Sequence, residues 1–449
     1  MVDDLLKNPY QKSPMKIKEN ERFRVFIWTL FDFANTSYSI VVVTFLYAVY
    51  FKQTVVEGKA VGDFYWSIGT SISMLITALI SPILGAIADY SAGKKRFLLF
   101  FTLTCIVSTC LLYFVNRGDI FLGLTLFIIA NVGFEAGLVF YDAFLPEITA
   151  PKNYGRVSGY GFAMGYLGSL TTLALVFPFI KSQMIKETFP VSALVFFLFA
   201  IPIFLFIKDS RKNVVRDKSF LRIGVTRVLN TISHLKNYKN LSIFLLAFFF
   251  YIEGVNTVIY FSGNYASTTL HFSMEELIVF FLIVQTTAIL GSLVFGFFAD
   301  SYGQKKSLVI SLVIWIFTIL LAFATSDKNN FVIQSFCKIF NSDPEKISRS
   351  SFYLVGLLAG SVMGATQSTS RSLMSKLTPF EKKTEFFGFY SLFGKSSAIL
   401  GPLVFGYVSF ITGEQRFAIL TICIFFIIGL AVLSFVKDEK VEIAQIDVT

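Results

Sequence analysis

The sequence has few of the residues that catalytic and metal centres need. It contains two histidines and four cysteines in 449 residues, and none of them has the spacing of metal ligands or of a disulfide framework. There is no Ser-His-Asp set, and no Gly-Lys pair has the spacing of a phosphate-binding loop. These gaps argue against an enzyme, a metalloprotein and a nucleotide-binding protein. We therefore expect no catalytic residue, no metal and no cofactor.

Charged residues are also scarce. They make up 15% of the chain, against 55% hydrophobic residues and a mean hydropathy of +0.68. Soluble domains carry about 25% charged residues, so the composition indicates an integral membrane protein. The net charge of +10 does not indicate nucleic acid, because the basic residues lie between apolar runs and not in a polar domain. We expect no nucleic-acid partner.

Twelve apolar runs are long enough to cross about 30 Å of hydrocarbon at about 1.5 Å per residue. They predict an all-α membrane protein with twelve transmembrane helices. The first run carries an acid and is too long for a cleaved signal, so we expect it to remain as a span. The predicted spans are 24–51, 64–89, 97–115, 119–141, 156–180, 190–207, 241–261, 275–299, 307–324, 352–370, 386–410 and 416–435.

The distribution of Lys and Arg predicts the orientation of these spans. With the N-terminus in the cytoplasm, 28 of the 39 basic residues fall in cytoplasmic segments. This is a positive-inside pattern, and it places both termini in the cytoplasm. The short tails and the lack of a cleavable signal favour a bacterial inner membrane, with an organelle membrane as the alternative.

One long cytoplasmic connection separates six predicted spans from six others. It carries nine basic residues, and its segment SFLRIGVTRVLNTISHL has apolar residues at helical spacing. This pattern predicts an amphipathic helix lying on anionic lipid. A calmodulin-binding or nucleic-acid-binding helix is an alternative that the flanking spans disfavour. The predicted organisation is an N-terminal half at 1–207, the linker at 208–240 and a C-terminal half at 241–449, with an extracytoplasmic insertion near 327–349.

A repeated loop relates the two halves. The connection after the second predicted span reads GAIADYSAGKKR, and the connection after the eighth reads GFFADSYGQKK. Two related halves are typical of secondary transporters, in which the halves expose one site to each side of the membrane in turn. The recurring residues are Gly85, Asp89, Gly93, Lys94 and Lys95 in the first copy and Gly296, Asp300, Gly303, Lys305 and Lys306 in the second.

These loops resemble the signature loop of the major facilitator superfamily, although the first copy has one extra residue between Asp89 and Gly93. Five further stretches are similar to the autophagy-related vacuolar amino-acid effluxer family and its bacterial relatives. They are FDFANTSY, FEAGLVFYDAFLPEI, YIEGVNTVI, GATQSTSRSLMSKLTP and EFFGFYSLFGKSSAILGPLVFG. The similarity runs from Trp28 to Phe435. It implies the major facilitator fold, with two pseudo-symmetric six-helix halves, and passage of amino acids.

The signature loops predict a cytoplasmic gate. An acid at a helix end beside a tight basic turn can pair across the two halves and hold one access state closed. A loop that only sets topology would need the lysines alone. We expect Arg371, at the end of the tenth span, to be an ordinary interfacial arginine, with a gate or a phosphate-like contact as the alternative. Asp142 is similarly placed at the end of the fourth span.

Four ionisable residues lie inside predicted spans, away from the span ends. They are Asp32, Glu135, Glu253 and Lys395, in the first, fourth, seventh and eleventh spans. Such residues are costly in a bilayer and indicate function. Helical rise places them about 10–18 Å from the cytoplasmic ends. The resemblance implies that spans one, four, seven and ten line a cavity, so we expect the four charges to border it.

Three acids against one base leave negative charge that needs compensation. Three explanations stay open: a proton on Glu135 or Glu253, a cationic group of the substrate, or a purely structural salt bridge such as Lys395 with Glu135. Asp32 also suits the capping of neighbouring helix ends. A zwitterion would fit, with its carboxylate at Lys395 and its ammonium group at an acid. The side chains expected to add hydrogen bonds are Asn35, Tyr38, Asn256, Gln367 and Ser370.

The sequence thus predicts a secondary active transporter, a symporter or antiporter, that moves a small polar solute. What the resemblance implies is amino-acid transport, with proton coupling as an open possibility. We expect the protein to work as a monomer. One alternative is a proton-driven exporter of drugs or other organic ions. Another is a receptor or membrane-assembly protein that no longer transports. Charges retained inside the spans disfavour the second alternative, because loss of transport would relax the need for them.

Overall fold

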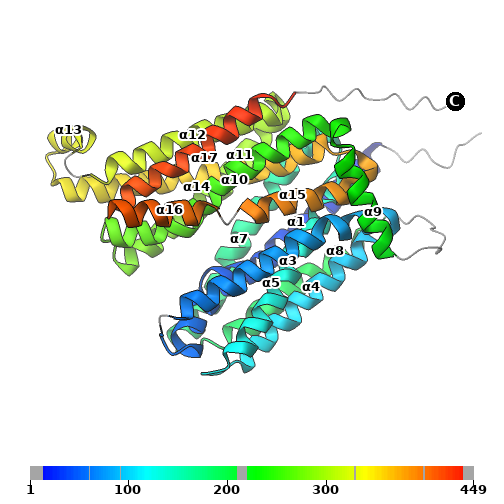
Figure 1. The fold of residues 1–449 in the computed structure, drawn as a ribbon, viewed down its shortest axis with the longest axis horizontal. Helices are drawn as coiled ribbons and strands as arrows, with labels where there is room; N and C mark the ends of the chain where they lie inside the picture. Colours follow the sequence, from blue (N-terminus) through cyan, green and yellow to red (C-terminus); the bar gives the residue numbers. More distant parts are fainter. Residues whose placement is uncertain are drawn as a thin grey trace, which may run out of the picture.

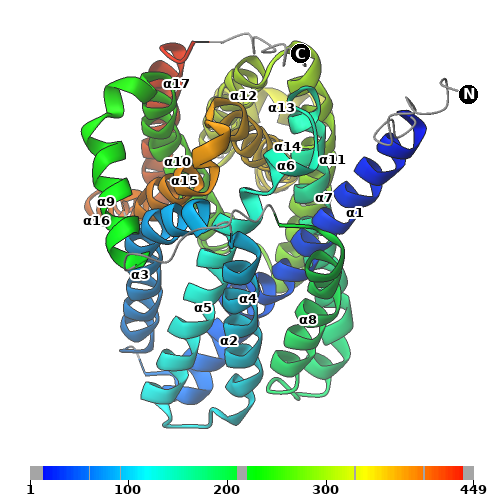
Figure 2. The same cartoon turned by 90° about the vertical axis from the view of Figure 1, so that its right-hand side faces the viewer.

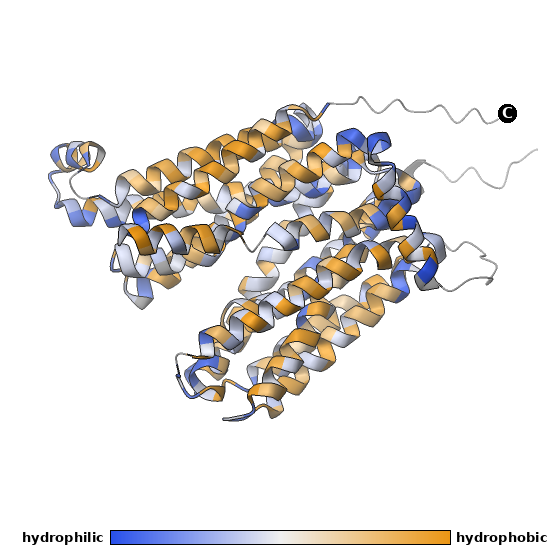
Figure 3. Cartoon of the chain, in the orientation of Figure 1, coloured by the Kyte–Doolittle hydropathy of each residue, from blue (hydrophilic) through white to orange (hydrophobic). Residues whose placement is uncertain are grey.

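The computed structural model describes residues 14–59, 61–91, 93–209, 220–327, 330–397 and 400–437, and over these residues it is entirely helical. Ten of the described helical segments are long and apolar enough to cross a membrane. Apolar residues run along the middle of these helices, and polar residues gather at their ends (Figure 3). The chain is therefore a multi-pass membrane protein.

The helices of the bundle pack as two groups (Figure 1). The first group packs through the pairs α4–α5, α1–α7 and α1–α8, and the second through α11–α14, α10–α17 and α12–α14. The first group contains α1 (Pro14–Tyr38), α3 (Val61–Ser91), α4 (Lys94–Leu111), α5 (Ile120–Asp142), α7 (Tyr154–Lys181) and α8 (Thr188–Phe206). The second contains α10 (Lys239–Thr269), α11 (Met274–Tyr302), α12 (Gln304–Thr325), α14 (Pro344–Leu377), α15 (Lys383–Ser397), α16 (Leu400–Thr412) and α17 (Gln415–Ser434).

The first membrane-crossing segment is not one regular helix. Helix α1 ends at Tyr38 and continues as a π-helical turn over Ser39–Thr44, the short α2 (Leu46–Tyr50) and a second π-helical turn over Phe51–Val55. Single π-turns within helices are frequently found at functional sites. The distortion directly follows the FDFANTSY stretch.

Two of the twelve predicted spans are not among the ten apolar segments. Helix α14 has 34 residues, which is ample length, but its many hydroxyl and charged side chains lower its hydropathy. The predicted span 386–410 falls on α15 and α16, which lie on either side of residues 398–399, outside the described part of the chain. A twelve-span topology stays a prediction.

The linker contains the expected amphipathic helix. Helix α9 (Phe220–Ser233) lies at one end of the bundle, which we call the linker end (Figure 2). One side of it packs on α3, where Gly224 contacts Ile83 and Ile87. Residues 210–219 of the linker lie outside the described residues, and lipid binding by α9 stays a prediction. Helix α13 (Phe331–Phe340), within the predicted insertion, lies at the opposite end, which we call the far end (Figure 1).

The two groups cross closely at the linker end through glycines. An added Cβ at Gly85 would overlap the Thr384 carbonyl of α15, and one at Gly159 would overlap the Ser292 carbonyl of α11. Small residues at such crossings allow helix backbones to touch. The crossings α3–α15 and α7–α11 thus depend on the absence of side chains.

We predict that Gly159→Val opens the linker end. The valine side chain has no room against α11, and overpacking of this kind costs about 1–3 kcal/mol. In a cysteine-free background, a Ser368→Cys probe, which replaces a fully buried side chain, should be labelled faster by a maleimide. Gly406→Val is the matched control, because nothing lies within 4 Å of a Cβ there. Equally slow labelling in the Gly159→Val variant and the parent would contradict the prediction.

Candidate functional site

A buried arginine joins the two groups. Arg371 of α14 is 2% exposed. Its Nη1 donates to Asp32 Oδ2 and to Asp142 Oδ1, each at 3.1 Å, and Nη2 also donates to Asp32 Oδ2 at 3.1 Å. Nε donates to the Ser158 hydroxyl at 3.0 Å, and Nη2 donates to the Ser158 carbonyl at 2.9 Å. Four helices, α1, α5, α7 and α14, thus meet at one guanidinium group.

Aromatic rings enclose the same guanidinium. Its Cζ lies 4.7 Å from the Trp28 ring centroid, 4.2 Å from that of Phe162 and 5.7 Å from that of Tyr141. Trp28 and Tyr141 stack at 4.6 Å, and each donates a hydrogen bond to the backbone carbonyl of the other. Cation–π contacts strengthen when they are shielded from water. The rings therefore help to hold the charge in a dry environment.

This cluster corrects two expectations from the sequence. Arg371 is not an interfacial arginine, because it is buried among acids and aromatic rings. Asp32 pairs with Arg371 and does not serve as a helix cap. One signal in the sequence could have revealed the cluster. Asp32 and Asp142 both lie in the first half, where no basic residue lies inside a predicted span away from its ends. Their cation therefore had to come from the second half.

A second ion pair connects the groups. Lys395 Nζ of α15 pairs with Glu135 Oε2 of α5. The Lys395 side chain is 24% exposed and the Glu135 side chain is 8% exposed. Glu135 lies about 10 Å along α5 from its linker-end terminus by helical rise. The pair is thus near the middle of the bundle and is partly accessible, unlike the enclosed Arg371 cluster.

Glu253 of α10 is fully buried and stands apart from both pairs. Its Oε1 accepts a hydrogen bond from the backbone N–H of Gly401, in the first turn of α16. Its Oε2 is buried without a hydrogen-bond partner, and no Lys or Arg among the described residues pairs with it. Among the described residues, the backbone N–H of Gly401 is thus the one hydrogen-bond donor to this carboxyl group.

The remaining predicted hydrogen-bonding residues are dispersed. The Tyr38 hydroxyl is 3.4 Å from Asn131 Oδ1, and Ser370 is paired with the Tyr251 hydroxyl at 2.7 Å within the second group. Gln367 accepts a hydrogen bond from Tyr166 across the two groups. Asn35 is buried with its Nδ2 unpaired, and Asn256 is half-buried.

The acids of the two signature loops bind helix N-termini across the groups. Asp89 accepts hydrogen bonds from the backbone N–H groups of Thr384 and Glu385 at the start of α15. Asp300 accepts from the backbone N–H groups of Gly155 and Arg156 at the start of α7, and from Arg156 Nε at 2.7 Å. The two copies thus make equivalent contacts in opposite directions, and most of their donors are backbone groups.

The loop lysines do not pair with these acids. Lys95 Nζ donates to the Ile207 carbonyl just past α8, and Lys305 Nζ donates to the Ser434 carbonyl at the end of α17. Lysine near a helix C-terminus favours the partial negative charge there. Lys94 pairs with Glu147, whereas Lys306 is exposed.

The glycines of the two loops differ in conformation. Gly303 has φ = +102°, which favours glycine, whereas Gly93 has φ = −121°, which any residue adopts. The extra residue of the first copy thus changes its turn. Gly85 and Gly296 both lie at the crossings between the groups, where an added Cβ would overlap the opposite backbone.

Helix α9 is attached to the same end. The Thr231 hydroxyl of α9 donates to Glu385 at the start of α15, and Lys382 Nζ donates to Thr231 at 3.0 Å. Burial raises the pKa of Glu385, and the hydrogen bond from Thr231 with the charges of Lys382 and Arg227 opposes that rise. The linker helix therefore contacts both groups, through α3 and α15.

All hydrogen bonds and ion pairs between described residues of the two groups lie in the linker-end part of the bundle. The deepest are the Lys395–Glu135 pair and the Tyr166–Gln367 bond. Toward the far end, the ion pairs stay within one group, such as Arg117–Glu57 in the first and Arg349–Glu276 in the second. These contacts close the linker end. The Lys395–Glu135 ion pair and the Tyr166–Gln367 hydrogen bond are the polar contacts between the groups that lie farthest from this end.

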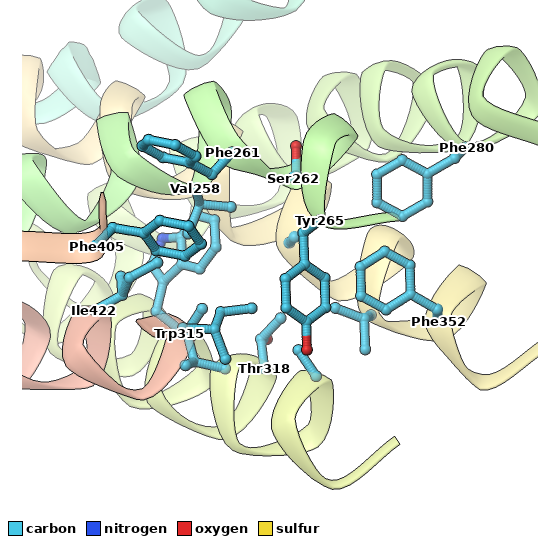
Figure 4. Close-up of a pocket in the computed structure, with 15 residues that line it drawn as sticks. Val258, Phe261, Ser262, Tyr265, Phe280, Trp315, Thr318, Phe352, Phe405 and Ile422 are labelled. Atoms are coloured by element: carbon cyan, nitrogen blue, oxygen red, sulfur yellow. The ribbon is translucent and has the colours of Figure 1, made fainter. Parts of the chain in front are cut away.

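A small cavity in the second group is unsuited to a polar solute. It has a volume of about 40 Å³ and is lined by side chains such as Phe261, Trp315, Phe352 and Phe405 (Figure 4). An apolar cavity of this size stays dry. It is a packing defect among α10, α11, α12, α14, α16 and α17.

The helical arrangement and the buried charges define a membrane transporter of the major facilitator type. Solved structures with this fold include the proton:xylose symporter XylE, with a TM-score of 0.70 and 13% identity over 94% of this chain and 96% of that chain. A bacterial homologue of the iron transporter ferroportin, in an outward-facing state, gives a TM-score of 0.65 and 12% identity over 92% of this chain and 98% of that chain. At such identities the likeness shows the fold alone.

The chain belongs to the family described as vacuole effluxer Atg22 like, whose profile matches residues 64–445. It is 33% identical over 432 residues to YxiO of Bacillus subtilis (strain 168), described as an uncharacterized MFS-type transporter, and covers 92% of this chain and 94% of that one. It is 23% identical to autophagy-related protein 22 of Kluyveromyces lactis, over 82% of this chain and 79% of that one. The predicted family is confirmed, and the relatives are transporters, not enzymes.

We predict that Arg371→Gln strongly destabilises the protein. It would leave Asp32 and Asp142 buried without a cation, and removal of one partner of a buried pair costs about 3–5 kcal/mol. Thermal unfolding of the purified protein measures the loss. Asp142→Asn in the Arg371→Gln background should recover part of it.

Arg349→Gln is the matched control for this prediction, because it breaks a partly exposed pair with Glu276. Such pairs contribute about 1 kcal/mol or less. Equal losses of stability in the Arg349→Gln and Arg371→Gln variants would show that the buried cluster is not the stronger contact.

Proposed function

We propose that the protein carries amino acids across the membrane by alternating access between the two helix groups. The observation that carries the proposal is the Lys395–Glu135 pair, in which a cation and an anion from opposite groups meet, partly exposed, near the middle of the bundle. A zwitterion can replace this pair, with its carboxylate at Lys395 and its ammonium group at Glu135. Binding would then exchange an internal ion pair for two pairs to substrate, and burial of either charge would stay compensated.

The linker end is proposed to be cytoplasmic, with twelve spans, six in each half, and both termini on that side. Basic residues concentrate at this end, as the positive-inside rule requires. The cross-group contacts at the linker end would then close the cytoplasmic side, and the structure corresponds to an outward-facing state. The bacterial relative at 33% identity supports a bacterial inner membrane as the location.

The cytoplasmic gate is proposed to consist of the Arg371 cluster and the signature-loop acids. Asp89 and Asp300 each bind a helix N-terminus of the opposite group, so both contacts must break when the linker end opens. Backbone N–H groups at helix termini are readily solvated by water. These outer contacts therefore open at lower cost than the enclosed Arg371 cluster.

Glu253 is proposed to carry a coupled proton. Its carboxyl group is buried, has one hydrogen bond, and lacks a cationic partner among the described residues. A buried carboxylate in such surroundings is stabilised by protonation or by a cation. Glu135 already has Lys395 as its counter-ion, so Glu253 is the better candidate of the two acids considered from the sequence.

We predict that Glu135→Gln and Lys395→Gln each abolish amino-acid exchange in reconstituted vesicles without unfolding the protein, because each removes one contact to the zwitterion. The reversed pair Glu135→Lys with Lys395→Glu keeps an ion pair but misplaces both charges, and should also fail to exchange. Recovery of exchange by the reversed pair would support a purely structural salt bridge. Glu276→Gln, at the exposed pair of the far end, is the control and should exchange normally.

We predict that Glu253→Gln separates exchange from coupling. The amide mimics the protonated acid but cannot release a proton. Amino-acid exchange should persist within about twofold, whereas net flux driven by an imposed pH gradient should be lost. Gradient-driven flux in the Glu253→Gln variant equal to that of the unmodified protein would exclude Glu253 as the coupling group.

A further inference from the structure

A groove on the side of the bundle has the chemistry of a phospholipid site. It lies between α1, α7 and α11 at the linker end, where these helices adjoin (Figure 2), and has a volume of about 880 Å³. Helices α1 and α7 belong to the first group and α11 to the second. The groove is therefore formed only by the two groups together. It is separate from the central charges and does not depend on which solute is carried.

The mouth of the groove is basic. Arg22, Lys152 and Arg156 line it, against one acid, Glu21. Arg156 is paired with Asp300. Glu21 accepts hydrogen bonds from Thr149 at 2.6 Å and from Asn153 at 3.3 Å, which hold it at one wall. Arg22 and Lys152 are exposed, and no ion pair joins either of them to another described residue.

The deeper part of the groove is apolar. It is lined by Phe26, Met164, Leu167, Ile289 and Leu293, and Phe26 and Leu167 are exposed at its open side. The Arg156-to-Leu167 stretch of α7 rises about 16 Å, close to half of the roughly 30 Å hydrocarbon thickness. A ligand that fills the groove therefore needs an anionic head and an apolar tail as long as one leaflet.

We propose that this groove binds one anionic phospholipid, with the phosphate at Arg22 and Lys152 and an acyl chain along α7 and α11. Charge complementarity selects the headgroup, because a zwitterionic lipid gains less from an unpaired arginine and lysine. The acyl chain contacts both helix groups. Occupancy therefore stabilises the closed linker end, since opening would move α11 away from α1 and α7.

The test measures the melting temperature of the purified full chain in neutral detergent during titration with phosphatidylglycerol, phosphatidylcholine or inorganic phosphate. A ligand that binds only the folded state raises this temperature. Phosphatidylglycerol should raise it at the lowest concentration. The same rise with phosphatidylcholine would overturn the headgroup assignment. The same rise with inorganic phosphate alone would show that the groove is an anion site and not a lipid site.

Two variants test the position of the lipid. Arg22→Gln with Lys152→Gln should weaken phosphatidylglycerol binding by roughly 25-fold, because each charge contributes about fivefold near an anionic headgroup. Met164→Trp keeps the charges but fills the apolar part, and should also weaken binding. The matched control, Arg222→Gln with Lys306→Gln, removes two exposed charges elsewhere at the linker end. Equal weakening in the control would reduce the effect to general surface charge and overturn the proposal.

Discussion

The closed linker end depends most on the buried guanidinium of Arg371. A charge removed from water is costly unless it is fully paired. Two carboxylates, a serine and three aromatic rings supply that pairing, and they come from three helices of the opposite group. The position of α14 relative to α1, α5 and α7 is therefore fixed by the need to satisfy one side chain. Removal of one partner from such a set costs about 3–5 kcal/mol, because the remaining charge stays buried without compensation.

Around this centre the contacts are of a different kind. Asp89 and Asp300 accept mainly from backbone N–H groups at helix starts. When the groups separate, water can replace these donors and acceptors at little net cost, because hydrogen bonds are exchanged and not lost. The glycines at the crossings bring the backbones into contact but add no directional bond. The linker end thus combines a buried charge cluster at Arg371 with outer hydrogen bonds at Asp89 and Asp300 that water can replace. This combination suits an interface that must close firmly and also open.

The sequence predicted the class of fold because hydropathy and the repeated loop report directly on spans and on internal symmetry. It also placed Glu135 and Lys395 at similar depths in their spans, and a salt bridge between them was one of the three explanations left open. It failed for Arg371, because a residue at the end of an apolar run looks interfacial unless its partners on other helices are known. It could not show that Asp89 and Asp300 bind backbone groups, since those donors have no side-chain signature.

In the proposed mechanism, the charge balance inside the bundle favours Glu253 as the residue that carries the coupled proton. Asp32 and Asp142 share Arg371, and Glu135 has Lys395. Glu253 alone among these acids has no cation among the described residues, and its single donor is a backbone N–H in the first turn of α16. Movement of α16 would remove that donor and shift the equilibrium between the protonated and ionised forms of Glu253. Lys395 of α15 and Gly401 of α16 belong to the same predicted span. The proposed substrate contact at Lys395 and the proposed proton site at Glu253 would therefore both act on that span.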